Sequence, residues 1–464
     1  MCSSDLHYYE KITQDIVLEN LEAFAREKVP VDVFQIDDGY QQAVGDWLSA
    51  NHKFPEGMKA IARRVHEAGY KAGLWLAPFI CEEKSALLRE HPDFVLKDEN
   101  GKRVVAGYNP FNWSGQFYAL DFYHPPVREY LKKVFDTVLQ EWGFDLVKLD
   151  FLYAVAMIPH AGRSRGQIMQ EAMDFLREAV GEKEILGCGV PLGPAFGKVD
   201  YCRIGSDVGL FWEDRRLARM GYRERVSTYN SLTSTIGRRH LNGHVFLNDP
   251  DVFILREKKQ RMSLPQRKTL FLLNLIFGGL VFTSDNLAEY GEEEKRTYRS
   301  QFPVKPKTVH GVTRMGNVRR VDFQIEEKRY VAFSNLGSRR ENFSLESGVY
   351  FEKGMRWIEG GKEFPLGPYA SVCFLKAPEG EWGIAGSDGH IFPGSEVDIF
   401  HAEEGEVTLG WHRHALLPEK VYLKIPDDRT ECNVNGKVWP ARKTGAGLTI
   451  CAVEPKGQGD AMQE

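Results

Sequence analysis

The chain lacks the features that mark a membrane protein or a nucleic-acid-binding protein. Its 464 residues contain no apolar run near the roughly 18 residues that a membrane helix needs, and the longest candidate, 270–282, is interrupted by Gly278 and Gly279. The formal net charge is −5, whereas nucleic acids and anionic membranes favour a basic surface. We therefore expect neither partner.

Cysteine is scarce, and its spacing matches no disulfide framework or metal site. The seven cysteines are scattered and odd in number, with no CxxC or CxxxH pattern, which is typical of reduced thiols. Residues 1–10 lack the basic start and apolar stretch of a signal peptide. Together these observations predict a cytoplasmic protein.

The first 300 residues alternate short apolar strands with amphipathic helical segments, the signature of a parallel sheet built from βαβ units. A doubly wound sheet competes with a barrel, but the chain has no GxGxxG turn to favour it. Eight such units predict a (β/α)8 barrel, an α/β fold. The strands expected are 33–36, 72–76, 146–149, 185–186, 201–204, 245–247 and 280–283, with an eighth near 2–9; the helices expected are 58–68, 127–142, 168–180, 223–236 and 264–275.

After about residue 301 the pattern changes to period-two strands separated by turns, which indicates antiparallel β structure. We predict three parts: a catalytic barrel over 1–302 with an atypical or truncated first strand, a C-terminal β-sandwich over 303–377, and a further β-rich segment over 378–464. The tail after Glu454 is expected to be disordered.

Acidic residues recur where the predicted strands end, which is where barrel enzymes place their chemistry. Lys148 and Asp150 lie two apart on one strand and so share a face, where the cation would keep Asp150 ionised. An ionised, oriented carboxylate suits a nucleophile. The alternative is a structural ion pair at a strand end.

Asp207 follows the strand 201–204 through a Gly-Ser turn and could reach over the mouth of the barrel. A protonated carboxyl there could donate to a leaving oxygen, although Asp is also a common helix N-cap. Two such acids form the pair that glycoside hydrolysis needs, about 5–5.5 Å apart for retention and about 6.5–9.5 Å apart for inversion.

Other candidates could bind a sugar. Asp37 and Asp38 are acceptors for hydroxyl groups if Gly39 lets the strand turn, or else a solvated turn. Trp75 and Tyr8 could pack against a pyranose, or fill the core. Cys188 on its own is more often a small buried residue. Asp249 and Asp251 could line the mouth of the barrel or cap a helix, and we favour capping.

Four segments taken together resemble glycoside hydrolase family 36, the bacterial α-galactosidases. They read FQIDDGY (34–40), GLWLAPF (73–79), VKLDF (147–151) and RIGSD (203–207). One such motif is weak evidence, but four in order and register are specific. The resemblance extends roughly over 8–377.

The resemblance implies a role for each matching position. Asp150 corresponds to the family nucleophile and Asp207 to its acid/base. Asp37 and Asp38 match the pair that holds the galactose 4- and 6-hydroxyls, and Trp75 matches an aromatic wall. The other binding residues implied are Lys148, Arg203, Cys188 and Tyr8. The family uses no metal and no organic cofactor.

The chain also departs from the family pattern. Family members carry a large β-sandwich before the barrel, which we do not find here, and the first strand usually reads GWCSWY where this chain has MCSSDLHYY. We therefore expect a truncated or altered start. The stretch after about residue 377 exceeds the usual family end.

The leading hypothesis is a retaining exo-α-galactosidase that acts on a small-molecule or oligosaccharide substrate. Galactosyl transfer and cleavage of α-N-acetylgalactosaminides use much of the same machinery and stay open, as does a sugar-binding remnant without turnover. The oligomeric state is open too, a homo-oligomer included.

Overall fold

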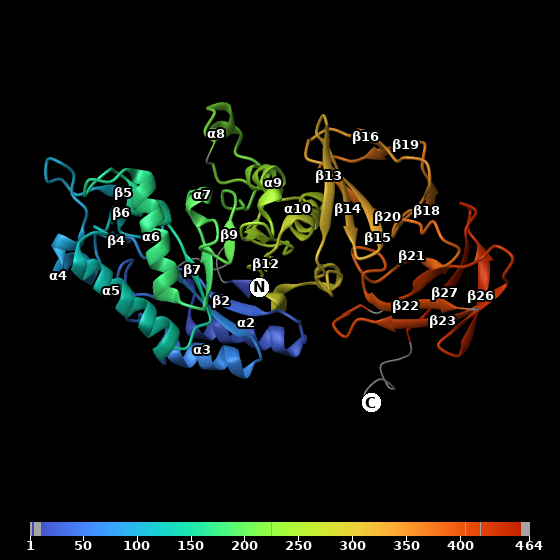
Figure 1. The fold of residues 1–464 in the computed structure, drawn as a ribbon, viewed down its shortest axis with the longest axis horizontal. Helices are drawn as coiled ribbons and strands as arrows, with labels where there is room; N and C mark the ends of the chain where they lie inside the picture. Colours follow the sequence, from blue (N-terminus) through green and yellow to red (C-terminus); the bar gives the residue numbers. More distant parts are fainter. Residues whose placement is uncertain (1, 4–10, 224, 404, 418, 456–464) are drawn as a thin grey trace. The chain divides into compact units, whose positions relative to one another are not determined.

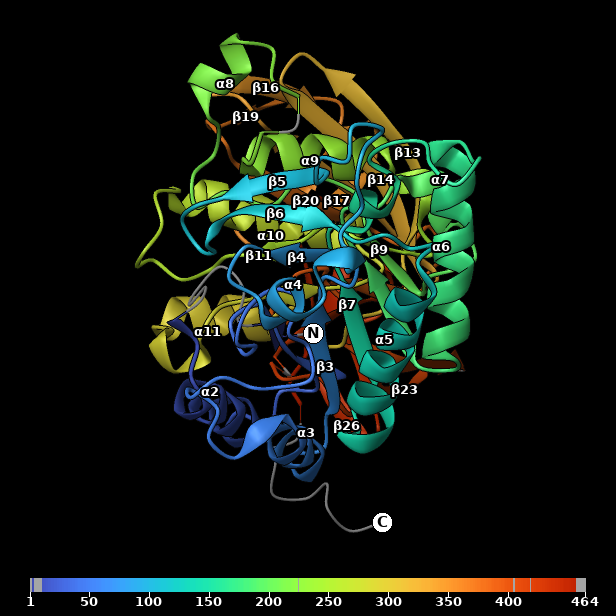
Figure 2. The ribbon, with the colours of Figure 1, turned by 90° about the vertical axis from the view of Figure 1, so that its left-hand side faces the viewer.

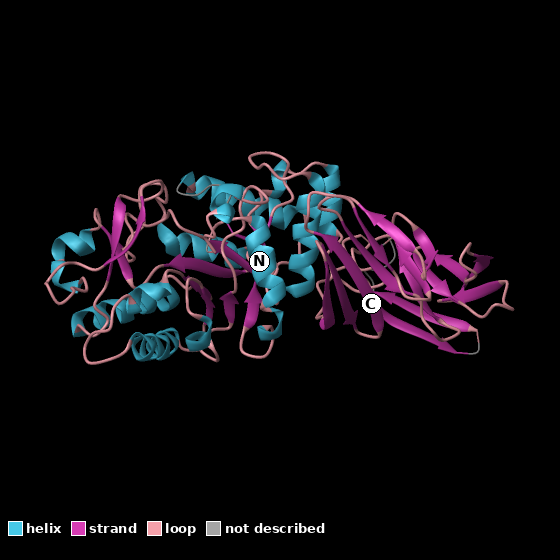
Figure 3. Ribbon diagram, turned by 90° about the horizontal axis from the view of Figure 1, so that it is seen from above, coloured by secondary structure: helices cyan, strands magenta, loops and turns pink. Residues whose placement is uncertain are grey.

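The structure, a computed structural model, describes residues 2–3, 11–223, 225–403, 405–417 and 419–455. It forms two compact units (Figure 1). The first comprises Met1–Arg261 and Phe277–Glu289, and the second comprises Met262–Ile276 and Tyr290–Glu464. The first unit mixes helices and strands, whereas the second consists mainly of strands (Figure 3).

The first unit is built around a parallel sheet in the order β10-β9-β8-β7-β3-β2-β1-β12-β11. The two end strands, β10 and β11, are consecutive in the chain and are separated only by Pro250 and Asp251. Counted as one interrupted strand, they close the nine-stranded sheet into a barrel with eight strand positions. The strands are β1 (Cys2–Ser3), β2 (Val33–Ile36), β3 (Lys71–Leu76), β7 (Leu146–Leu149), β8 (Glu184–Gly187), β9 (Tyr201–Arg203), β10 (Leu247–Asp249), β11 (Val252–Phe253) and β12 (Phe282–Thr283).

Burial explains why these segments read as short, nearly continuous apolar runs. Every residue of β2 and β7 is buried, because parallel strands are covered on one face by helices and on the other by the interior. The (β/α)8 barrel followed by antiparallel β structure, predicted from the alternation, is confirmed.

Amphipathic helices surround the barrel strands, and local capping sets where several of them begin. In α6, Ser164 and Gln167 form a capping box, which satisfies two otherwise unpaired N–H groups. The helices of this unit are α2 (Gln14–Arg26), α3 (Gly57–Glu67), α4 (Ala86–Glu90), α5 (Pro125–Asp136), α6 (Arg165–Val180), α7 (Leu192–Ala195), α8 (Arg215–Arg219) and α9 (Thr228–Gly237). None of the helices in the described part of the chain combines the length and apolar character that crossing a bilayer requires.

A small antiparallel sheet interrupts the barrel pattern between β3 and α5 (Figure 2). Its strands are β4 (Ile80–Glu82), β5 (Val105–Asn109) and β6 (Gly115–Ala119), in the order β4-β6-β5. The sequence analysis did not predict it, because its strands are short and carry several polar residues.

The second unit contains a six-stranded and a seven-stranded sheet, each with its own apolar core. The six-stranded sheet has β13 (Thr308–Met315), β14 (Val318–Ile325), β15 (Lys328–Asn335), β20 (Ser371–Lys376), β17 (Val349–Glu352) and β18 (Arg356–Glu359). The seven-stranded sheet has β21 (Gly383–Ser387), β24 (Val421–Lys424), β27 (Thr449–Val453), β26 (Lys437–Lys443), β25 (Glu431–Val434), β23 (Glu406–Trp411) and β22 (Val397–Glu403). A two-stranded sheet of β16 (Glu341–Ser344) and β19 (Glu363–Leu366) and the helices α10 (Leu264–Phe277) and α11 (Glu292–Arg299) complete the regular elements.

Several predicted bounds differ from the structure for local reasons. The helix expected over 127–142 is α5 followed by a π-helical turn, Thr137–Glu141. The helix expected from 223 starts at Thr228, because Ser227 caps it by accepting from the backbone N–H of Asn230. The strand expected over 245–247 is two residues later, as β10. The predicted boundaries at 302 and 377 stay predictions, and the expected disordered tail lies largely outside the described residues.

Candidate active site

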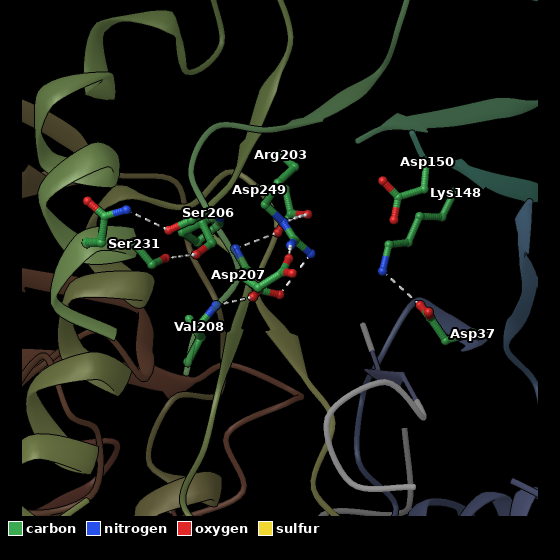
Figure 4. Close-up of polar contacts among 12 residues, drawn as sticks. Asp37, Lys148, Asp150, Arg203, Ser206, Asp207, Val208, Ser231 and Asp249 are labelled. Carbon is green, nitrogen blue, oxygen red and sulfur yellow. Dashed lines mark hydrogen bonds and ion pairs between the residues drawn. The ribbon is translucent and has the colours of Figure 1, made fainter. Parts of the chain in front are cut away.

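The four carboxylates expected at the site lie at the carboxyl ends of three barrel strands, β2, β7 and β9. Asp37 and Asp38 follow β2, Asp150 follows β7, and Asp207 follows β9 through the turn Gly205-Ser206. Because parallel strands all end on the same side of a barrel, these side chains converge on one mouth. Figure 4 shows two acidic groups: one contains Asp37, Lys148 and Asp150, and the other contains Arg203, Asp207 and Asp249.

Asp37 is buried and held by three donors. Lys148 Nζ lies 2.8 Å from its Oδ2, Gln35 Nε2 donates to the same oxygen at 2.7 Å, and the Asp38 N–H donates to Oδ1 at 2.9 Å. Burial alone would raise the pKa of Asp37, but the charge and hydrogen bond of Lys148, with the hydrogen bonds from the Asp38 N–H and Gln35, outweigh it and lower the pKa. Asp150 was the expected partner of Lys148, but the structure shows Lys148 in an ion pair with Asp37 (Figure 4).

Asp38 is held by neutral donors. Its Oδ1 accepts from Gln41 Nε2 at 2.6 Å and its Oδ2 from Trp113 Nε1 at 2.9 Å. Burial raises the pKa of Asp38 to about 6, because the two hydrogen bonds offset only part of the cost of removing the charge from water. Asp37 and Asp38 therefore have unlike electrostatic environments although they are adjacent.

The raised pKa of Asp38 predicts that the unfolding free energy depends on pH. The folded chain holds the Asp38 proton up to about pH 6, whereas the unfolded chain releases it near the ordinary value of 3.8, so ionisation lowers the unfolding free energy as pH rises through this window. Asp38→Asn removes the ionisation. We expect the stability of the variant relative to the parent to rise by about 2.4 kcal/mol between pH 4 and pH 7, measured by urea unfolding. A difference that stays constant over this range would contradict the assignment.

Asp150 is oriented by two hydrogen bonds, one to each oxygen. The N–H of Phe151 donates to Oδ1 at 2.7 Å, and Trp75 Nε1 donates to Oδ2 at 3.2 Å. Phe151 adopts a left-handed backbone conformation with φ of 53°, which turns the chain sharply after the strand. Trp75 therefore contributes a hydrogen-bond donor as well as an aromatic ring to this site.

Asp207 is bound through one oxygen to Arg203. Arg203 Nη1 donates to Asp207 Oδ1 at 2.8 Å, and the Asp207 side chain is 58% exposed. The next helix, α8, is capped by Asp214, so Asp207 is not the N-cap that the sequence left open. The turn before Asp207 is held by Asn230 Nδ2, which donates to Ser206 Oγ at 3.0 Å.

Arg203 is itself held by two buried carboxylates, a role that the sequence analysis did not predict. Its Nε donates to Asp249 Oδ2 at 2.8 Å (Figure 4). Its Nη2 pairs with Asp251 Oδ1, also at 2.8 Å. Asp251 Oδ2 also accepts from the N–H of Val208, next to Asp207, at 2.6 Å. The prediction that Asp249 and Asp251 cap a helix was wrong, because the break between β10 and β11, with Asp251 at φ 74°, turns both toward Arg203.

Cys188 follows β8 and is buried. Burial, reinforced by the negative charge of Asp150, holds the pKa of its thiol well above the ordinary value. The residue therefore stays a neutral thiol. The described cysteines with placed side chains are all buried and free: Cys81, Cys188, Cys202, Cys373, Cys432 and Cys451.

A cavity of about 510 Å³ joins the two acidic groups, a size suited to a small ligand. Six of the predicted residues line it: Asp37, Asp38, Trp75, Lys148, Asp150 and Asp207. Arg203 and Cys188 are buried and do not belong to this lining, and Tyr8 lies outside the described residues. Among the described residues, no group of three or more His, Cys, Asp or Glu side chains is placed to hold a metal ion.

The sequence analysis missed other residues that line the cavity. They are Asn109, Asn112, Trp113, Phe151, Val208, Gly209, Leu210, Phe211, Val226 and Arg261. Asn109, Asn112 and Trp113 belong to the inserted sheet, and Arg261 lies far along the chain from the motifs. The run YNPFNW, rich in aromatic and amide side chains, was the one signal that could have indicated the first group.

The fold and the site define a (β/α)8 barrel protein with a cluster of carboxylates at the carboxyl ends of its strands. The model of the melibiase family matches residues 6–177. Alpha-galactosidase 1 of Pediococcus pentosaceus is 30% identical over 146 residues, which is 29% of this chain and 19% of that protein. The α-galactosidase of Escherichia coli is 28% identical over 182 residues, 37% of this chain and 24% of that protein.

Solved structures extend the similarity over more of the chain. TtGalA, an α-galactosidase from Thermus thermophilus solved in complex with p-nitrophenyl α-D-galactopyranoside, is 35% identical with a TM-score of 0.61, over 69% of this chain and 64% of that chain. These matches show that the chain is related to the α-galactosidases, as the four motifs predicted. The chain covers less than two thirds of each of these relatives, and its placement in family 36 stays a prediction.

Proposed function

We propose that the chain is a retaining exo-α-galactosidase that releases terminal α-galactosyl groups. The observation that carries the proposal is the convergence of Asp150 and Asp207, from two different strands, on one sugar-sized cavity that Asp37, Asp38, Lys148 and Trp75 also line. The similarity to α-galactosidases supports the substrate class. The free buried cysteines agree with a cytoplasmic location.

The hydrogen bonds of Asp150 and Asp207 support different chemical roles for the two side chains. Asp150 has both oxygens oriented by N–H donors, and it attacks the anomeric carbon. Asp207 has one oxygen held by Arg203, which leaves the other to give its proton to the leaving oxygen as the glycosidic bond breaks. Water then attacks the galactosyl-enzyme, Asp207 takes a proton from that water, and Asp150 is released.

Asp37 and Asp38 act on the sugar ring. As acceptors held in place by Lys148, Gln41 and Trp113, they receive hydrogen bonds from the galactose 4- and 6-hydroxyls. Carboxylates held in place lose little freedom when the sugar binds, and that preorganisation favours affinity.

The test is the configuration of the first product. The purified chain is mixed with p-nitrophenyl α-D-galactopyranoside, and the anomeric proton of the released galactose is followed by NMR before mutarotation. We expect α-galactose first, because two displacements restore the configuration. Initial release of β-galactose would exclude a retaining mechanism, and absence of hydrolysis would exclude α-galactosidase activity of this chain.

A further inference from the structure

The inserted sheet β4-β6-β5 brings to the cavity a side chain that no motif indicated. The turn between β5 and β6 carries Trp113, which lines the cavity together with Asn109 and Asn112. Trp113 is half-buried, so part of its ring remains open to a ligand. Barrel enzymes commonly vary these loops after the strands to change their substrates.

Trp113 contacts Asp38 and also the segment that bears Asp150. Its Nε1 donates to Asp38 Oδ2 at 2.9 Å. Its ring centroid lies 6.4 Å from that of Trp75 and 5.2 Å from that of Phe151, the residue after Asp150. A change in the position of the Trp113 indole would therefore directly alter the hydrogen bonding of Asp38.

The position of Trp113 is set by a buried carboxylate. Glu82 on β4 accepts from the N–H of Ser114 at 2.6 Å and from the N–H of Val44 at 2.9 Å. One side chain thereby ties the turn that carries Trp113 to the loop that follows Asp38. Gly107 on β5 leaves room for the ring of Phe117, because a Cβ at this position would lie 2.3 Å from that ring. The ring centroids of Phe117 and Trp113 are 5.1 Å apart.

The two carboxylates thus have different supports. Asp37 is held by Lys148 and Gln35 of the barrel strands. Asp38 is held by Gln41 of its own loop and, on its other oxygen, by Trp113 of the inserted sheet. The galactose 4-hydroxyl is attached to the ring, and the 6-hydroxyl is on an exocyclic carbon that reaches further out. The inner carboxylate therefore suits the 4-hydroxyl and the outer one suits the 6-hydroxyl.

We propose that Trp113 is a specificity-determining residue that orients Asp38 to bind the 6-hydroxyl, so that the site selects galactosides over their 6-deoxy analogues. The inference rests on the proposed α-galactosidase function and deepens it.

The test compares two substrates in the parent and in Trp113→Phe, which keeps an aromatic ring and removes the N–H donor. The substrates are p-nitrophenyl α-D-galactopyranoside and its 6-deoxy analogue, p-nitrophenyl α-D-fucopyranoside. Loss of a hydrogen bond to a charged group predicts a fall in kcat/KM of about 10- to 100-fold on the galactoside. We expect this fall mainly as a higher KM, with a much smaller change on the 6-deoxy substrate.

Two control variants isolate the effect. Phe111→Ala changes the same turn at a side chain that is 93% exposed, and Trp142→Phe repeats the substitution outside the described lining of the cavity. Both should keep the parental preference between the two substrates. Equal losses on both substrates in Trp113→Phe would show a merely structural role and overturn the proposal.

A binding measurement separates this proposal from the proposed activity. If the parent hydrolyses neither substrate, calorimetry with galactose and with D-fucose makes the same comparison without turnover. Preference for galactose that is lost in Trp113→Phe would support the role of Trp113 even though the hydrolase proposal had failed. Equal affinity for the two sugars in the parent would overturn the role of Trp113.

Discussion

Asp150→Ala is expected to lower kcat/KM for p-nitrophenyl α-D-galactopyranoside by about four to six orders of magnitude, as the loss of a nucleophile does in other enzymes with a covalent intermediate. Without this carboxylate no galactosyl-enzyme can form. Asp136→Ala is the matched control, because it removes an exposed aspartate on the outer helix α5 and should retain full activity. Activity of the Asp150 variant near that of the parent would refute the assignment.

Azide added to the Asp150→Ala variant tests whether Asp150 is the nucleophile, which a loss of activity alone does not show. The alanine leaves space on the face from which the carboxylate attacks, so azide can displace the leaving group there in one step. The product is then β-galactosyl azide, with inverted configuration, which NMR distinguishes from the α-anomer. Production of α-galactosyl azide by this variant would instead place the nucleophile at another residue.

Asp207→Ala is expected to show a loss that depends on the leaving group. A sugar leaving group needs a proton as the bond breaks, so kcat/KM for a galactosyl disaccharide should fall by about 10²- to 10⁴-fold. A dinitrophenyl leaving group needs little protonation, and its kcat/KM should change much less. Azide in this variant should give α-galactosyl azide, because Asp150 still forms the intermediate. Equal losses on both substrates would argue against an acid/base role.

The unfolding free energy distinguishes the catalytic role proposed for Asp207 from the structural role of Asp249, which binds the same arginine. Its side chain is 58% exposed, so loss of its ion pair with Arg203 should lower the unfolding free energy by at most about 1 kcal/mol. Asp249 is fully buried against the same arginine. Asp249→Ala should cost about 3 kcal/mol or more, measured by urea unfolding of both variants.

Short-range patterns in the chain were sufficient to indicate the barrel. The strands β2 and β7 have the bounds predicted for them, because buried parallel strands are apolar throughout and a polar turn follows each one at once. The same patterns placed Asp37, Asp38, Asp150 and Asp207 at strand ends. Their convergence then followed from one geometric rule, that parallel strands of a barrel all end on one side.

Only the three-dimensional arrangement decided which groups interact, since ion pairs and hydrogen bonds form between segments far apart in the chain. Lys148 pairs with Asp37, 111 positions away, and Arg203 reaches Asp249 and Asp251 because β10 breaks at Pro250. Trp113 lies 75 positions from Asp38, on a sheet with no strong periodicity. Such contacts depend on how whole strands and insertions pack, and no local pattern of apolar and polar residues encodes that packing.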